Sequence, residues 1–149
     1  MKIREQMPEL SGATAWINGR ASRAQLVGEK LTLIHFWSVS CSLCKTAMPS
    51  VNALHRQYKN DLNMIAVHMP LSKKDLDLDQ IKETTRKHNI FHPVFVDNNE
   101  VLTDAFRNQY VPAYYLFDTQ GRLRYFQTGR SGLKLLHQRI ERLLGKQNK

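Results

Sequence analysis

Apolar runs of strand length alternate along the chain with longer segments that carry apolar residues at helical spacing. Leu31–Phe36 and Leu62–His68 are mostly apolar, a pattern that is typical of strands buried on both faces of a sheet. A shorter apolar segment around Pro93–Val96 predicts a third strand. Ala113–Phe117 and Leu123–Gln127 flank a turn sequence that ends in Gly and predict a hairpin.

Four segments show helical spacing. The first opens at Cys41 and runs to about Lys59, and Pro49 inside it should kink the helix because proline has no N–H. Asp77–His88 and Asn99–Phe106 predict two further helices. The last helix is indicated by a C-terminal stripe of Leu133, Leu136, Ile140, Leu143 and Leu144.

Turn and cap residues organise the first thirty residues. Asn18-Gly19 follows the apolar segment Thr14–Ile17 and predicts a tight hairpin there, because this dipeptide accepts positive φ angles. A short helix should follow, with Ser22 as its N-cap and Gly28 at its end.

The order of these elements predicts an α/β fold. Early strand–helix alternation implies parallel strands joined by crossover helices, and the late hairpin implies an antiparallel edge. We therefore expect a mixed central sheet with helices on both faces. No repeat or flexible linker divides the chain, so residues 1–149 are expected to form a single domain.

Composition and charge exclude several other classes of protein. Of the 149 residues, 42% are hydrophobic and 23% are charged, within the globular range. The net charge of +9 is spread over scattered Lys and Arg, so we expect a solvated basic surface and no nucleic-acid site. No stretch approaches the roughly 18 apolar residues that span a membrane. Met1–Gln6 lacks the apolar segment of a secretory signal, which favours a cytoplasmic protein.

The two cysteines, Cys41 and Cys44, are the candidate chemistry. A secreted disulfide scaffold uses more cysteines, and structural zinc needs four ligands, so redox chemistry is the leading interpretation. The pair follows a buried strand and opens a helix, where free N–H groups and the helix dipole favour a thiolate. We expect Cys41 to attack a disulfide and Cys44, one turn further in, to resolve the mixed disulfide.

The active-site segment resembles that of a known family. Phe36–Lys45, with Cys41-Ser42-Leu43-Cys44 inside it, is similar to the active-site stretch of thioredoxins. The continuation through Met48-Pro49, with an extra helix and strand before the C-terminal half, resembles the TlpA/ResA-type branch, and the likeness runs roughly from Met7 to Leu144. It implies a thioredoxin-like fold and thiol–disulfide exchange with protein disulfide substrates. It further implies an upstream dithiol donor, no cofactor and a monomeric protein.

The same resemblance implies further site residues. Val111-Pro112 matches the cis-proline segment that lies beside the two sulfurs, and Val111 would offer backbone groups to an extended substrate. Trp37 should lie against the active-site loop, in contact with substrate or in support of the loop. Gly121 and Gly129 flank the last strand as the family's glycines do.

Departures from the family pattern single out His35. It occupies the position of the buried Asp of thioredoxins, six residues before Cys41, and Ser40 replaces the usual Trp. A buried neutral imidazole can accept a proton, so His35 is a candidate base for Cys44, against the alternative of a hydrogen-bonded core residue. His68 is a second, weaker candidate. The other histidines, His55, His88, His92 and His137, are expected to face solvent or to fill helix surfaces.

Three alternatives remain open at this stage. If a leader was removed, the same residues fit an extracytoplasmic reductase that serves cytochrome assembly. A peroxidase of related fold would need a Pro-x-x-x-Thr-x-x-Cys stretch, which the sequence lacks. A non-catalytic metal-binding module would use both cysteines as ligands, but no further ligand is obvious beyond His35 or His68, so no metal is expected.

Overall fold

The computed structural model describes residues 1–129 and 133–145 and has a six-stranded mixed sheet at its centre. The strand order is β1-β4-β3-β2-β5-β6. The strands are β1 (Ala15–Ile17), β2 (Leu31–Trp37), β3 (Leu62–His68), β4 (Val94–Val96), β5 (Ala113–Phe117) and β6 (Leu123–Thr128). The helices are α1 (Arg23–Leu26), α2 (Ser42–Gln57), the 3₁₀ helix η1 (Lys73–Leu76), α3 (Leu78–Lys87), α4 (Val101–Phe106) and α5 (Leu133–Leu143). The mixed sheet of the α/β expectation is confirmed.

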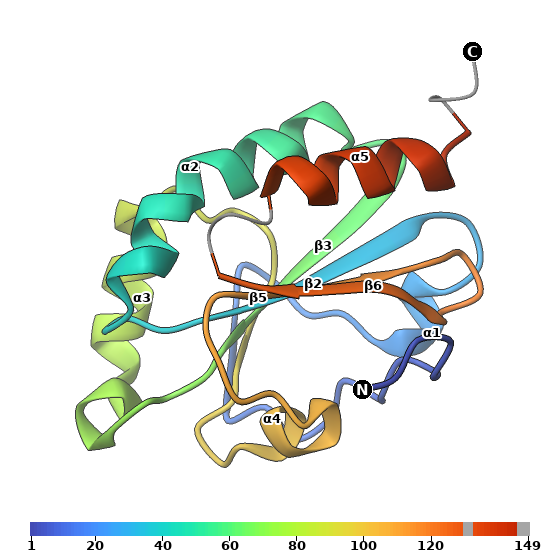
Figure 1. The fold of residues 1–149 in the computed structure, drawn as a ribbon. Coiled ribbons are helices and arrows are strands. Elements are labelled where there is room, and N and C mark those ends of the chain that lie inside the picture. The colour runs from blue at the N-terminus through green and yellow to red at the C-terminus, as the bar shows by residue number, and fades with distance from the viewer. Residues whose placement is uncertain (130–132, 146–149) are drawn as a thin grey trace.

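Helices cover both faces of the sheet (Figure 1). On one face α2 and α5 pack over β2 and β3, with Leu33, Val51 and Ile140 in the core between them. On the other face α1 and α4 enclose a second core that includes Phe36 and Phe106. Because residues of β2 point alternately to the two faces, every position of this strand is buried.

The central parallel pairing is long and in register. β2 pairs with β3 from Leu31 opposite Leu62 to Trp37 opposite His68, and β5 pairs antiparallel with the other side of β2. The carboxyl ends of β2 and β3 therefore lie side by side at one edge of the sheet. The loop that leads into α2 leaves the sheet at this edge.

The hairpin expected at Asn18-Gly19 is wrong. β1 pairs antiparallel with β4, which is far along the chain, with Ala15 opposite Val96. Asn18 and Gly19 do take positive φ angles, 64° and 107°. The turn leads toward α1 because the Asn18 side-chain amide donates to the carbonyls of Ile90 and His92, at 2.7 and 3.1 Å. A dipeptide that favours a local hairpin is thus held in place by hydrogen bonds to residues far along the chain.

Capping follows the sequence more closely. Ser22 caps α1 in a reciprocal capping box with Gln25. α2 continues through Pro49 and changes direction along its length (Figure 1). The helix expected at Asp77–His88 is α3, with Asp77 as N-cap and His88 as C-cap.

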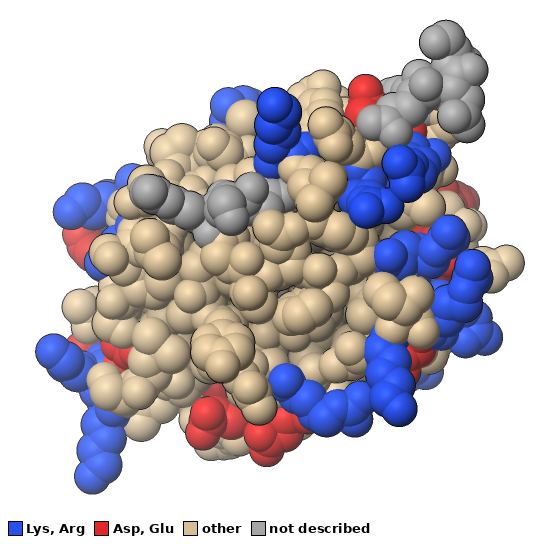
Figure 2. All heavy atoms as spheres, viewed as in Figure 1, with Lys and Arg blue, Asp and Glu red and all other residues tan. Residues whose placement is uncertain are grey.

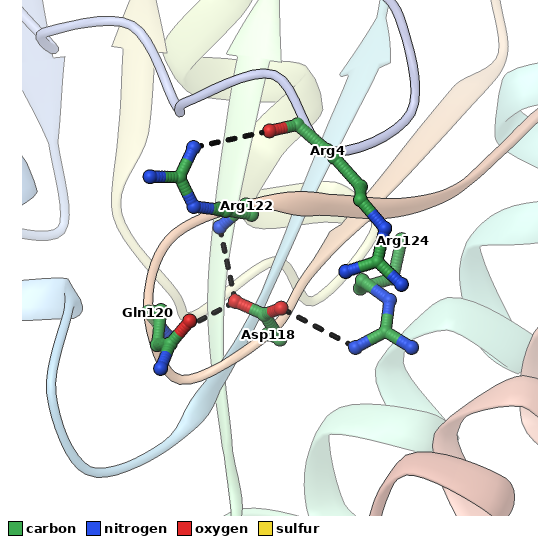
Figure 3. A network of polar contacts seen from close by, with 5 residues as sticks. All are labelled: Arg4, Asp118, Gln120, Arg122 and Arg124. Carbon is green, nitrogen blue, oxygen red and sulfur yellow. Dashed lines mark hydrogen bonds and ion pairs between the residues drawn. The ribbon is translucent and has the colours of Figure 1, made fainter.

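The turn between β5 and β6 is fixed by a polar network (Figure 3). The Asp118 carboxylate accepts from the backbone N–H groups of Gln120 and Arg122 and pairs with Arg124 at 3.4 Å. Arg122 in turn donates to the carbonyl of Arg4 at 3.3 Å, which ties the N-terminal segment to the hairpin. This network lies at the start of β6, the end of the sheet opposite the loop between β2 and α2.

The basic residues are spread over the surface. On the face shown in Figure 2, Lys and Arg lie around the edge, with a dense group on the side that carries α1 and the turn between β5 and β6. Arg122 in that turn and Arg124 at the start of β6 are exposed. None of the helices in residues 1–129 and 133–145 is both long and apolar enough to cross a bilayer.

One stability prediction follows from the start of α4. Asp97 is fully buried, and its carboxylate accepts from the N–H groups of Leu102 and Thr103 and from the Thr103 hydroxyl, at 2.7–3.1 Å. Asp97→Ala leaves these donors buried without partners, so the free energy of unfolding should fall by about 2–4 kcal/mol. Urea denaturation measures it. Asp104→Ala, at an exposed position of the same helix, should change it by less than about 1 kcal/mol; equal losses would contradict the assignment.

Candidate active site

Both cysteines lie where the central strand β2 gives way to α2. Cys41 is the N-cap of α2, with an extended backbone (φ −94°, ψ 105°), and Cys44 lies in the first turn. A disulfide joins the two residues across a Cα–Cα distance of 5.3 Å. The Cys44 N–H donates to the Cys41 sulfur at 3.1 Å. The Cys41 sulfur therefore sits at the helix N-terminus, where the helix dipole stabilises negative charge.

The two sulfur-bearing residues differ in access to solvent. Cys41 is 8% exposed, whereas Cys44 is 1% exposed. Leu43, between them, is 45% exposed and faces outward beside the disulfide. The outer and inner positions expected for the pair are therefore present, although Cys41 is more covered than a surface thiol.

A buried carboxylate holds the loop that precedes Cys41. Asp75, in η1, is 2% exposed. Its Oδ2 accepts from the hydroxyls of Ser38 and Ser40, at 2.9 and 2.7 Å, and from the N–H of Leu71, at 2.8 Å. Burial by itself would raise the pKa of Asp75, but these hydrogen bonds outweigh burial and hold the pKa below its ordinary value. Asp75 is therefore an anion at neutral pH.

His68 supports the same loop from the end of β3. Its Nε2 accepts from the Val39 N–H at 3.1 Å, and its ring lies edge-on against Trp37 at 5.1 Å between centroids. Burial lowers the pKa of His68 to about 4. The imidazole is thus neutral at neutral pH, and because Nε2 accepts, its proton sits on Nδ1.

Trp37 is the last residue of β2, and the segment Val111-Pro112 leads into the neighbouring strand β5. Trp37 is only 1% exposed and lies beneath the loop, an arrangement that suits support of the loop. The bond between Val111 and Pro112 is cis. It directly precedes β5, whose Ala113 pairs with Phe36 at the end of β2, and Val111 packs against the core cluster that contains both cysteines. Substrate contacts by Trp37, Val111 and Pro112 stay predictions.

His35 forms a buried pair with another histidine. It is 2% exposed, and its Nε2 lies 2.8 Å from Nε2 of His92, so one ring donates and the other accepts. Burial lowers the pKa of His35 to about 3 and moves that of His92 well below its usual value. Within the described residues, His35 makes no hydrogen bond to Cys41 or Cys44.

The expected surface location of His92 is wrong. His92 is 2% exposed and stands between His35 and His55, whose ring centroid lies 5.2 Å from its own. His92 precedes β4, so it faces His35 across β3, where Ala66 leaves room opposite His35. His55 and His88 are partly exposed, and His137 bonds the Tyr58 hydroxyl at 3.1 Å. The sequence pattern alone does not reveal a contact between residues 57 positions apart.

Asp75 is the main site residue that sequence reasoning missed. It is one acid in the polar segment 71–79, with no periodicity or motif around it. Its serine partners precede it by 35 and 37 residues. Ser38 and Ser40 could have indicated such a residue, because a buried hydroxyl such as that of Ser38 requires a hydrogen-bond partner.

A disulfide at the start of a helix, directly after the central strand of this sheet, defines a thioredoxin-like thiol–disulfide oxidoreductase. The chain belongs to the AhpC/TSA family, whose model matches residues 3–126. It is 58% identical over 144 residues to the thiol-disulfide oxidoreductase YkuV of Bacillus subtilis, covering 97% of each chain. The thiol-disulfide oxidoreductase ResA of Geobacillus thermodenitrificans is 23% identical over 126 residues, 84% of this chain and 70% of that protein.

A solved structure supports the same class. The solution structure of a thioredoxin-like protein in the oxidised form superposes with a TM-score of 0.90 at 57% identity, covering 98% of this chain and 99% of that one. The expected thioredoxin-like fold and thiol–disulfide oxidoreductase activity, with protein disulfides as substrates, are confirmed.

The buried histidines predict a pH-dependent stability. Unfolded histidine titrates near 6.5, whereas His35 and His68 titrate at about 3 and about 4 when folded. Between pH 6.5 and 4 the unfolded chain binds more protons, so stability must fall on acidification, by about 1.4 kcal/mol per pH unit for each histidine. Urea unfolding between pH 7 and 5 should show a shallower slope for His35→Gln. His88→Gln, at a partly exposed position, should change the slope less; equal slopes in all three proteins would contradict neutral burial of His35.

Proposed function

We propose that this thiol–disulfide oxidoreductase acts as a reductase of protein disulfides, with Cys41 as the attacking and Cys44 as the resolving cysteine. The observation that carries the assignment is the position of Cys41 as N-cap of α2, with Cys44 at 1% exposure behind it. The helix N-terminus favours a thiolate on Cys41, which is the reactive form of the thiol. Cys44 is close enough to Cys41 to form a disulfide with it, so it can attack a mixed disulfide on Cys41.

The reaction moves two electrons and two protons to the substrate. The Cys41 thiolate attacks one sulfur of a substrate disulfide, forms a mixed disulfide and releases a substrate thiolate. Cys44 then loses its proton and attacks the Cys41 sulfur, which releases the second substrate thiolate. Both substrate thiolates take up protons. The products are a substrate dithiol and the Cys41–Cys44 disulfide.

The cycle closes only when the Cys41–Cys44 disulfide is reduced again. A second dithiol must supply these two electrons, so we propose an upstream dithiol donor as a partner. The sulfurs carry the electrons, so the step needs no cofactor. Both cysteines and the loop contacts come from one chain, which supports action as a monomer.

We propose that substrate lies against the segment Val111-Pro112. Val111 packs against the cluster that contains both cysteines, and only Pro112 separates it from β5, the strand that neighbours β2. Its backbone groups suit an extended peptide placed across Cys41. Trp37 and Leu43 border the same region, one beneath the loop and the other exposed.

We propose a cytoplasmic location. Both cysteines of the chain are in the redox pair, and this sparing use of cysteine is typical of a reducing compartment. The alternative, an extracytoplasmic reductase for cytochrome assembly, uses the same chemistry. Fractionation of cells that carry the tagged native gene separates the two locations.

Alkylation tests the roles of the two cysteines. When the reduced protein meets limiting iodoacetamide at neutral pH, Cys41 should be labelled first, because its thiolate is favoured and more exposed. Peptide mass analysis measures the label at each cysteine. Cys44→Ser should trap a mixed disulfide between Cys41 and a model substrate, whereas Cys41→Ser should trap none. Preferential labelling of Cys44 would reverse the assignment.

His35→Asn tests whether the His35–His92 pair accepts the proton of Cys44. The variant should form the mixed disulfide at the normal rate but resolve it about 10²-fold more slowly, the usual contribution of a general base. Single-turnover kinetics measure the two steps separately. Because the pKa of His35 is about 3, its protonation adds no inflection above pH 5. His88→Asn is the control, and an unchanged resolution rate from pH 5 to 9 would leave His35 as a core residue.

A further inference from the structure

The carboxylate of Asp75 is buried without a cationic partner. A fully buried Asp is rare unless it is paired. No ion pair among the described residues involves Asp75. Lys73 and Lys74, on the same 3₁₀ helix, are exposed. Its three donors are the Ser38 and Ser40 hydroxyls and one backbone N–H, which are neutral groups. These hydrogen bonds therefore stabilise the negative charge of Asp75, but no positively charged side chain in the described part of the chain neutralises it.

This charge lies against the loop that precedes Cys41, the proposed attacking cysteine. Ser40, whose hydroxyl is 2.7 Å from the carboxylate, is the residue before Cys41. Since consecutive Cα atoms are about 3.8 Å apart, the carboxylate is within roughly 12 Å of the Cys41 sulfur. His68 is the ionisable group that interacts with Asp75 from β3, and burial keeps it neutral at neutral pH because its pKa is about 4.

We propose that Asp75 is a positioning residue that sets the redox balance of the Cys41–Cys44 pair. Its fixed negative charge opposes a thiolate on Cys41 and so counters part of the stabilisation by the N-terminus of α2. A less stable thiolate makes the dithiol form less favourable and the disulfide more favourable. The dithiol is then a stronger electron donor, as a reductase requires. This inference deepens the proposed reductase function and rests on it.

Because Asp75 only accepts hydrogen bonds from the loop, one substitution can remove its charge while the loop keeps its conformation. Asp75→Asn retains an oxygen that can accept from Ser38 and Ser40 but removes the negative charge. The same side chain volume remains in the buried site. A change in the redox equilibrium of this variant therefore reports the charge, provided that its circular dichroism spectrum matches that of the wild type.

The experiment is a redox titration against mixtures of reduced and oxidised glutathione. Reduction of the protein disulfide consumes two glutathione thiols and yields one glutathione disulfide. In Asp75→Asn the equilibrium should move toward the dithiol by about 3- to 10-fold, and tenfold corresponds to about 30 mV. The pH profile of Cys41 alkylation should move to lower pH, because the thiolate forms more readily.

Two matched variants complete the test. Asp77→Asn removes the same charge two residues further along, where the carboxylate accepts from the N–H groups of Asp79 and Gln80 at the start of α3, so its equilibrium should stay within twofold of wild type. Ser40→Ala retains the carboxylate and removes one donor at an exposed position, so it should also move the equilibrium less than Asp75→Asn. If Asp75→Asn does not fold, Asp75→Ser removes the same charge with a smaller side chain, and the same shift is required.

An unchanged equilibrium in a folded Asp75→Asn or Asp75→Ser protein would overturn the proposal. So would an equal shift in Asp77→Asn, which would assign the effect to net charge. The glutathione equilibrium depends neither on which cysteine attacks first nor on the protein substrate. A failure of the proposed function would appear instead in the labelling and trapping of wild-type and cysteine variants.

Discussion

The parallel register of β2 and β3 is the constraint on which the site depends. Trp37 pairs with His68 at the last position of both strands, and the Met69 N–H donates to the Trp37 carbonyl at 2.9 Å. The loop before Cys41 therefore leaves the sheet directly beside the end of β3. From there His68 and the segment after it reach the loop backbone and hydroxyls. A change of register by one residue would turn His68 to the other face.

The electrostatics of the site combine neutral histidines with one fixed anion. Burial keeps the pKa values of His35 and His68 far below neutrality, so neither ring adds charge near the cysteines. Asp75 remains ionised because three donors converge on one oxygen. The N-terminus of α2 supplies the opposing positive potential. The reactivity of Cys41 is thus set by two fixed features of opposite sign, both of which come from the chain itself.

The sequence was informative where structure is local. Continuous apolar runs located β2 and β3, helical spacing located α2 and α5, and the two cysteines located the site. It was misleading where a local signal met a distant partner. Asn18-Gly19 has the backbone of a turn, but its amide binds carbonyls more than 70 residues away. Asp75 and His92 were missed for the same reason, because their partners are brought near only by the crossover connections.

The N-terminal segment also gives β6 a neighbour. β6 is the last strand of the sheet, and along its start Arg4 and Glu5 exchange backbone hydrogen bonds with Leu123, while Gln6 forms a bridge with Arg122. An open strand edge offers unpaired N–H and carbonyl groups to other chains. By occupying these groups, the N-terminal segment closes the start of this edge to pairing with another chain, at the end of the sheet opposite the cysteines.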